Sequence, residues 1–284
     1  MKSQKSSTHE ASSCLYLVAT PIGNLEDMTM RALRILKEVD MIAAEDTRNT
    51  KKLCNYFDIS TPLTSYHEHN IEVGGEKILN LLRDGKQVAL VSDAGLPCIS
   101  DPGADIVEKA IAEGFAVVPI PGANAALTAL IASGISPQPF YFYGFLGRGK
   151  KGRKETLESL RRREETILFY EAPHRLKDTL ISMLEILGDR NICISREISK
   201  IHEEVLRDKI SNLIDVADSL KGEFVLVVEG NHSVIDFSHM SIIEHVKLYV
   251  EDGLSEKDAI KLVAKERNVA KSIVYSEYHC DKDK

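Results

Sequence analysis

The sequence predicts an α/β protein with a parallel-sheet N-terminal domain, a second domain with a mixed sheet, and a small C-terminal helical module. Three observations predict this class. Short β-rich apolar runs alternate with helical patterns up to about residue 135, which is the signature of a parallel α/β sheet. A new series of strand patterns follows the link at 134–139, and only helical patterns follow residue 241. A chain of 284 residues also has the length of about two domains.

The first domain is expected over residues 14–120. Its strands are the buried-type runs at 14–19, 39–44, 87–91 and 115–120. Helical patterns lie near 27–37, 49–57, 73–84 and 102–113. Asp101 is placed to cap the last of these helices, because Pro102 needs no hydrogen-bond partner at a first helical position.

The second domain is expected over residues 121–232. It opens with a helix that follows Pro121-Gly122 and runs to Gly134. Strand patterns lie at 140–145, 166–171, 191–196, 203–208 and 223–229. Helical patterns fall near 153–163, 174–187 and 211–220. Together these elements predict a second α/β unit with a mixed sheet.

The C-terminal module is expected over residues 238–284. Three short helices are predicted at 242–252, 255–267 and 270–279, the second capped by Ser255. Their tight middle turn resembles a helix-turn-helix. The module carries eight basic and nine acidic residues, whereas nucleic-acid modules are markedly basic. Helical packing or partner binding therefore stays open beside nucleic-acid binding.

Composition excludes several classes of protein. The 36 Lys and Arg residues face 43 Asp and Glu, for a net charge of −7, so any phosphate-binding surface must be a local patch. The five cysteines are scattered, which argues against a disulfide framework and a zinc site, and no metal is expected. No apolar run approaches the ~18 residues of a membrane span, and the polar N-terminus lacks the apolar core of a secretory signal. We expect a cytoplasmic protein without membrane contact.

One basic patch stands at residues 148–154, which read RGKKGRK. Its five basic side chains are Arg148, Lys150, Lys151, Arg153 and Lys154. The two glycines indicate a flexible loop. A solvated surface loop and a phosphate contact are both consistent with so short a run.

Four turns rich in glycine and proline each follow a predicted strand, at 19–25, 92–103, 119–124 and 170–175. Open α/β sheets bind ligands outside the carboxyl ends of their strands, and glycine lets backbone approach a ligand closely. One such turn is explained by topology alone. Four of them favour a shared ligand cleft.

These turns resemble those of the tetrapyrrole methylase superfamily, in particular its branch that methylates small-subunit ribosomal RNA. The motifs that carry the resemblance are YLVATPIGNLED (16–27), AAEDTRNT (43–50), VSDAGLPCISDPG (91–103), PIPGANAA (119–126), FYEAPHR (169–175), REISKIHEE (196–204) and GEFVLVVEG (222–230). The resemblance implies a homodimeric two-domain methylase with S-adenosylmethionine in the cleft between its domains. It also implies methyl transfer to the ribose 2′-hydroxyl of a cytidine in the decoding region of 16S rRNA, in the small ribosomal subunit.

The resemblance also assigns roles to residues. Those expected at the cofactor are Pro21, Asp93, Ala94, Gly95, Pro121, Gly122, Ala123, Asn124, Tyr170, Glu171, Ala172, Gly222, Glu223 and Phe224. The 2′-hydroxyl must lose a proton, and the candidates to accept it are Glu45, Asp46, Glu171, His174 and Glu197. Glu171 or His174 has the alternative role of holding its turn or pairing with Arg175.

Basic residues in and beside the motif loops are expected to contact phosphates. These are Arg48, Arg175, Arg196 and Lys200, together with the five of the 148–154 segment. Ion pairs with nearby glutamates are the competing account for Arg161–Arg163. Two other functions stay open: the same fold acting on a tetrapyrrole or protein substrate, and a ribosome-binding relative without catalysis.

Overall fold

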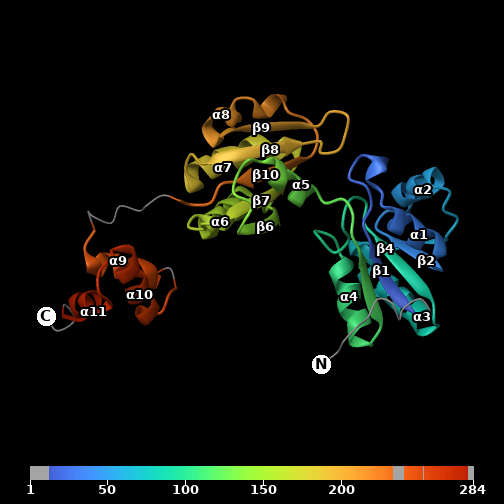
Figure 1. The fold of residues 1–284 in the computed structure, drawn as a ribbon, viewed down its shortest axis with the longest axis horizontal. Helices are drawn as coiled ribbons and strands as arrows, with labels where there is room; N and C mark the ends of the chain where they lie inside the picture. The colour runs from blue at the N-terminus through green and yellow to red at the C-terminus, as the bar shows by residue number, and fades with distance from the viewer. Residues whose placement is uncertain (1–12, 233–239, 252, 281–284) are drawn as a thin grey trace. The chain divides into compact units, whose positions relative to one another are not determined.

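The computed structural model describes residues 13–232, 240–251 and 253–280. They fall into two compact units, one up to Asn231 and one from His232 onward (Figure 1). The first unit holds both sheets, and the second holds the C-terminal helices. The predicted fold class, a parallel-sheet half, a mixed-sheet half and a small helical module, is confirmed.

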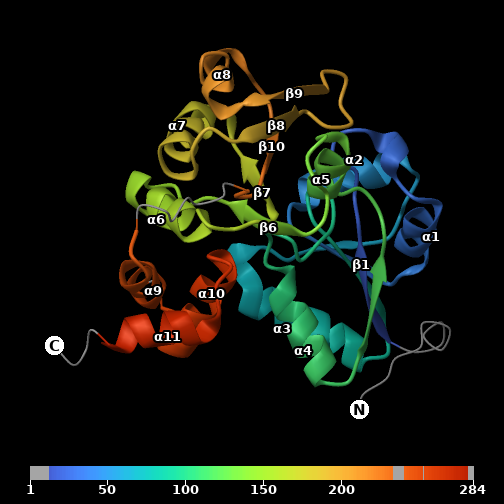
Figure 2. The same cartoon turned by 60° about the vertical axis from the view of Figure 1, so that its left-hand side comes forward.

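The first sheet is entirely parallel, with strand order β3-β2-β4-β1-β5. Its strands are β1 (Cys14–Val18), β2 (Met41–Ala44), β3 (Leu63–Ser65), β4 (Gln87–Val91) and β5 (Ala116–Ile120). Four helices cover it, α1 (Met30–Glu38), α2 (Thr47–Tyr56), α3 (Ile71–Arg83) and α4 (Gly103–Ala112). One apolar cluster lies under α1 and α2, and another under α3 and α4. Figure 2 shows α3 and α4 side by side.

Two local features of this half differ from the prediction. Strand β3 was not predicted, because it is a three-residue edge strand with only one buried side chain. Helix α4 begins at Gly103, one residue later than expected. The residue at the N-cap position of α4 is Pro102, not the predicted Asp101. Asp101 lies one residue earlier, where its Oδ1 accepts hydrogen bonds from Gly103 N at 2.7 Å and Cys98 N at 2.9 Å.

The second sheet is mixed, with strand order β6-β7-β10-β8-β9, and only the β6–β7 pair is parallel. Its strands are β6 (Phe140–Phe145), β7 (Thr166–Glu171), β8 (Asn191–Arg196), β9 (Glu204–Lys209) and β10 (Phe224–Val228). Helices α6 (Lys150–Leu160), α7 (Leu176–Leu187) and α8 (Ile210–Ile214) pack on one face, and α5 (Ala125–Ala132) packs on the other. Alternate residues of β7 enter the two clusters, as the period of a strand requires.

The chain passes from the first sheet to the second through the turn at 121–124. Asn124 caps α5 by accepting a hydrogen bond from Leu127 N at 2.9 Å. The two sheets belong to one compact unit, so the predicted boundary at residue 120 divides two halves of that unit. Within the described ranges, no helix has both the length and the apolar character that crossing a membrane would need.

The second unit contains α9 (Ile242–Glu251), α10 (Glu256–Glu266) and α11 (Lys271–Cys280) around an apolar core of its own. Ser255 caps α10, as predicted, by accepting a hydrogen bond from Asp258 N at 3.2 Å. His245 is fully buried, and its Nε2 lies 3.1 Å from Glu266 Oε2. Most of the predicted connector at 231–241 lies outside the described residues.

Candidate functional site

The turns that follow the strands of the first sheet meet at its carboxyl end. After β1, the backbone of Thr20 pairs with that of Gly95, which follows β4 (N–O distances 2.9 and 3.0 Å). The Thr20 hydroxyl also donates to Ser92 O at 3.1 Å. These bonds hold two of the predicted turns together at the edge where parallel sheets bind ligands.

A cavity of about 340 Å³ is lined by residues of both halves of the α/β unit. Eight residues predicted to hold the cofactor line it: Ala94, Gly95, Asn124, Tyr170, Glu171, Ala172, Glu223 and Phe224. The other six stand outside the lining: Pro21, Asp93, Pro121, Gly122, Ala123 and Gly222. The prediction missed the apolar part of the wall: Ile22, Leu96, Ile99, Phe145, Ile198 and Val225.

Backbone strain concentrates around this cavity. Cys98 and Ser100 have φ angles of 73° and 67°, and Glu197 and Ser199 have 51° and 69°. Each such left-handed non-glycine residue costs about 1–3 kcal/mol and persists only where neighbouring structure holds it. Strain of this kind gathers at functional sites, and here it shapes the loops that carry Glu197 and Asp101.

Two glycines outside the lining make room for its walls. A Cβ on Gly122 would lie 2.6 Å from Ala19 Cβ, and one on Gly222 would lie 2.5 Å from Glu197 Oε1. Gly222 also has a φ of +101°, a conformation that only glycine adopts readily. At both positions the absence of a side chain lets the backbone pack closely against the neighbouring residue.

Glu45 follows β2 and lines the cavity. Its Oε2 accepts a hydrogen bond from Asp93 N at 3.2 Å. Burial raises the pKa of Glu45, and the nearby carboxylates of Asp93, Asp101 and Asp46 raise it further, against the effect of that hydrogen bond. Glu45 therefore keeps its proton to a higher pH than an ordinary glutamate.

The carboxylates of Asp46 and Asp93 accept hydrogen bonds from residues at the start of α2 and in the loop before it. Asp46 caps α2 by accepting from Arg48 N at 2.8 Å, and Arg48 Nη2 lies 2.7 Å from its Oδ2. Hydrogen bonds from the Arg48 side chain lower the pKa of Asp46 to about 2. The exposed Asp93 carboxylate accepts from Asp46 N at 3.2 Å and from Asn49 Nδ2 at 3.1 Å. Neither carboxylate lines the cavity.

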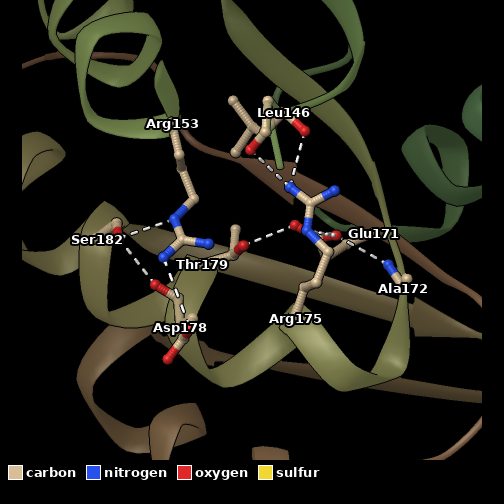
Figure 3. A network of polar contacts seen from close by, with 9 residues as sticks. Leu146, Arg153, Glu171, Ala172, Arg175, Asp178, Thr179 and Ser182 are labelled. Carbon is tan, nitrogen blue, oxygen red and sulfur yellow. Dashed lines mark hydrogen bonds and ion pairs between the residues drawn. The ribbon is translucent and has the colours of Figure 1, made fainter. Parts of the chain in front are cut away.

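Glu171 sits at the end of β7 in a buried network of polar contacts (Figure 3). Its Oε1 accepts from Ala172 N at 2.9 Å and lies 3.3 Å from Arg175 Nε. Its Oε2 accepts from the Thr179 hydroxyl at 2.6 Å. Both oxygens thus have structural partners, which matches the alternative reading of Glu171 as a residue that holds its turn.

Glu197 and Glu223 both form ion pairs with Lys200, and all three residues line the cavity. Lys200 Nζ lies 2.9 Å from Glu197 Oε1 and 2.7 Å from Glu223 Oε2. Burial alone would raise the pKa of Glu197, but Lys200 and the backbone N–H of Glu223 outweigh it and lower that pKa. The Lys200 ammonium is engaged by two carboxylates in the cavity wall.

The remaining predicted residues lie in different settings. His174 is exposed in the short 3₁₀ helix Pro173–Arg175 and is outside the lining. Arg196 pairs with Glu204 at 2.9 Å. Arg153, which was expected to contact phosphate, is only 5% exposed and donates to Ser182 Oγ at 3.1 Å inside the protein.

Phe145 reaches the cavity through an irregularity in β6. The register with β7 shifts between Phe142 and Gly144, and a bulge re-aims the side chains that follow it. Phe145 is 54% exposed, and its ring lies 5.4 Å from that of Tyr170. The glycine inside the FYFYGF strand is the sequence signal that could have indicated this bulge.

Among the described residues, no group of three or more His, Cys, Asp or Glu side chains could hold a metal ion. The carboxylates of the cavity are instead held by backbone N–H groups, hydroxyls and basic side chains. The site thus combines an apolar wall, backbone polar groups and acidic side chains of unequal basicity.

Comparison with known proteins gives close relatives. The family model for tetrapyrrole (corrin/porphyrin) methylases matches residues 14–214. A Bacillus subtilis protein named ribosomal RNA small subunit methyltransferase I is 60% identical over 93% of this chain and 94% of its own. Proteins of the same name from Halalkalibacterium halodurans and Synechocystis are 53% and 42% identical, over 98% and 92% of this chain and 99% and 95% of their own.

Solved structures show the same fold at low identity. Diphthine synthase has a TM-score of 0.61 at 14% identity, covering 80% of this chain and 94% of its own. Uroporphyrin-III-C-methyltransferase from Thermus thermophilus has a TM-score of 0.57 at 19% identity, covering 76% and 94%. These two likenesses concern the fold alone.

Proposed function

The chain belongs to the tetrapyrrole methylase family, among the ribosomal RNA small subunit methyltransferases I, and we propose on this premise that it methylates the ribose 2′-hydroxyl of a cytidine in the decoding region of 16S rRNA. Family membership makes it an S-adenosylmethionine-dependent methyltransferase. The proposal of an RNA substrate rests on one observation. More than nine-tenths of the chain matches relatives named ribosomal RNA small subunit methyltransferase I.

The residues of the cavity fit S-adenosylmethionine. Its volume of about 340 Å³ falls within the range of roughly 300–1,000 Å³ that small-molecule sites occupy. Leu96 and Ile198 supply apolar wall, and backbone around Gly95 supplies polar groups. Glu45 and Asp101 supply negative charge, which suits a ligand that carries a positively charged sulfur.

When bound, S-adenosylmethionine supplies an electrophilic methyl group. We propose that Glu45 accepts the proton of the ribose hydroxyl. Its raised pKa brings it closer to the working pH, where general bases are most effective. The other carboxylates are weaker candidates: Asp46 is ionised and paired with Arg48, and Glu171 is held by structural contacts.

Orientation of the hydroxyl toward the methyl group would supply much of the acceleration. We propose that Arg148, Lys150 and Lys151, which are exposed, bind the RNA backbone and fix that orientation. These three residues follow Phe145, which lines the cavity, so they lie within a few residues of the cavity wall along the chain. Lys154 is partly engaged by Glu185 at 2.5 Å.

The test is methyl transfer to small ribosomal subunits from a strain that lacks this enzyme. With labelled S-adenosylmethionine, we expect label on a ribose 2′-oxygen of 16S rRNA, mapped by mass spectrometry. Tight cofactor binding without label on the subunit would refute the RNA substrate and turn the search to tetrapyrrole or protein acceptors. We also propose that the protein is a cytoplasmic homodimer, and sedimentation of the full chain tests the dimer.

A further inference from the structure

Arg175 was expected to grip phosphate, but the structure turns it inward. Its side chain is 14% exposed. Nη2 donates to the carbonyl oxygens of Leu146 at 2.7 Å and Gly147 at 3.0 Å, while Nε faces Glu171 (Figure 3). One guanidinium therefore joins the end of β7 to the two residues that precede the basic segment 148–154.

The carboxylate that holds Arg175 is itself fixed. The Glu171 side chain is 1% exposed, and its contacts with Ala172 N and the Thr179 hydroxyl tie it to the cavity wall and to α7. Glu171 is thus held by two hydrogen bonds, and Arg175 Nε lies 3.3 Å from its Oε1 as an ion pair without a hydrogen bond. The position of the Leu146 and Gly147 carbonyls is thus set relative to the cavity.

A second buried arginine fixes the other end of the segment. Arg153 donates from Nε to Ser182 Oγ, and its Nη2 lies 3.8 Å from Asp178 Oδ2. Both partners belong to α7, the helix that also carries Thr179. Between the two anchors, Arg148, Lys150 and Lys151 remain exposed.

We propose that Arg175 is a positioning residue, which holds the start of the exposed cationic segment 148–154 at a fixed place beside the cofactor cavity. The proposal rests on the proposed function, because it concerns where RNA is gripped relative to the methyl donor. Arg153 anchors the far end, so the two arginines that the sequence assigns to RNA serve to place the cations that touch it.

Arg175→Lys tests this role. Lysine keeps a charge beside Glu171 but cannot also span two carbonyls, because it lacks the planar fork of arginine. Arg190→Lys is the control: Arg190 is buried and donates to the carbonyls of Leu187, Glu229 and Arg161. None of these three residues lines the cavity. In Arg175→Lys alone, we expect KM for small subunits to rise about tenfold, with cofactor Kd within about twofold of wild type.

Hydrogen exchange gives a readout that does not depend on the substrate. Arg153 N donates to Gly149 O at 3.0 Å in the first turn of α6. Exchange of amides in this turn should quicken in Arg175→Lys and stay unchanged in Arg190→Lys. Exchange and KM that stay at wild-type values would overturn the proposal. A cofactor Kd that rises as much as KM would also overturn it, since the residue would then only support the cavity wall.

The salt dependence of RNA binding separates positioning from direct contact. Each lost phosphate contact lowers the slope of log K against log salt by about 0.7–0.9. Lys150→Ala should show this loss, whereas Arg175→Gln should weaken binding with an unchanged slope. A lower slope in Arg175→Gln would mean that Arg175 itself contacts phosphate. Failure of wild type to methylate the subunit would refute the proposed function, while the exchange measurement would still decide the anchoring role.

Discussion

Replacing Gly122 with alanine tests how tightly the turns around the cavity are packed. The added Cβ would lie 2.6 Å from Ala19 Cβ, whereas carbon atoms in favourable contact lie about 3.5–4.0 Å apart. The two turns must therefore separate by roughly 1 Å. Ala19 is 3% exposed, and its methyl group has no alternative rotamer, so the backbone itself must move. Overpacking of this kind costs about 1–3 kcal/mol.

Thermal unfolding of the full chain measures this loss, and calorimetry measures its effect on S-adenosylmethionine binding. We expect a fall in Tm of roughly 2–4 °C for each kcal/mol lost, with weaker cofactor binding. Gly152→Ala is the control, because open space surrounds Gly152 in α6 and alanine there should stabilise by about 0.5–1 kcal/mol. Adding Ala19→Gly to Gly122→Ala removes the opposing methyl and should restore part of the stability. A double variant whose loss equals the sum of the two single losses would refute the steric argument.

Three further predictions follow from the carboxylates and the caps. Glu45→Gln should lower kcat by about 10²–10⁴-fold and abolish the acidic limb of the pH–rate profile, whose midpoint should lie above the ordinary glutamate range because the pKa of Glu45 is raised by burial. Asp46→Asn should keep the acidic limb, since the pKa of Asp46 is about 2. The midpoint should fall slightly, because the Asp46 charge is one of the effects that raise the pKa of Glu45, and loss of the limb in Asp46→Asn would contradict the assignment. Lys200→Met should destabilise the protein at neutral pH and much less in acid. The pKa of Glu197 is lowered despite burial. The ionised carboxylate therefore stabilises the fold above the pKa that it has in the unfolded chain, and this stabilisation is lost as the pH falls through the lower pKa of the folded state. Equal losses of Tm at both pH values would exclude this. Ser255→Ala removes the cap of α10 and should cost the C-terminal unit about 1 kcal/mol, seen as a lower unfolding temperature of that unit, and an unchanged transition would show that the cap contributes nothing.

The strand and helix pattern of this protein was readable because it is local. Nine of the ten strands in the described part of the chain overlap a predicted strand, and β3 is the exception. Its three residues pair with β2 at the edge of the sheet. A run of three residues with one buried side chain is too short to show the period of a strand in the sequence. The turn motifs likewise indicated the cavity, because glycine and proline at strand ends leave a signature in the sequence itself.

The chemistry within the cavity was readable only in part. The sequence supplied Glu45, Asp46 and Glu171 as equivalent carboxylates, and only their surroundings separate them. Glu45 is half-buried near other negative charges, and Asp46 is paired with its neighbour Arg48. Glu171 is buried among contacts with Ala172, Arg175 and Thr179. A pKa depends on burial and on charges that come from other strands and loops.

By itself, the sequence determined the α/β class, the two sheets, the C-terminal helices and the turns that build the cavity, because backbone preference and side-chain periodicity act over a few residues. Only the tertiary structure decided which charged groups are available to a ligand. Arg153 and Arg175 reach partners 29 residues away, at Ser182 and Leu146. A long basic side chain turns inward where a distant hydroxyl, carbonyl or carboxylate replaces its water, and that replacement is a property of packing.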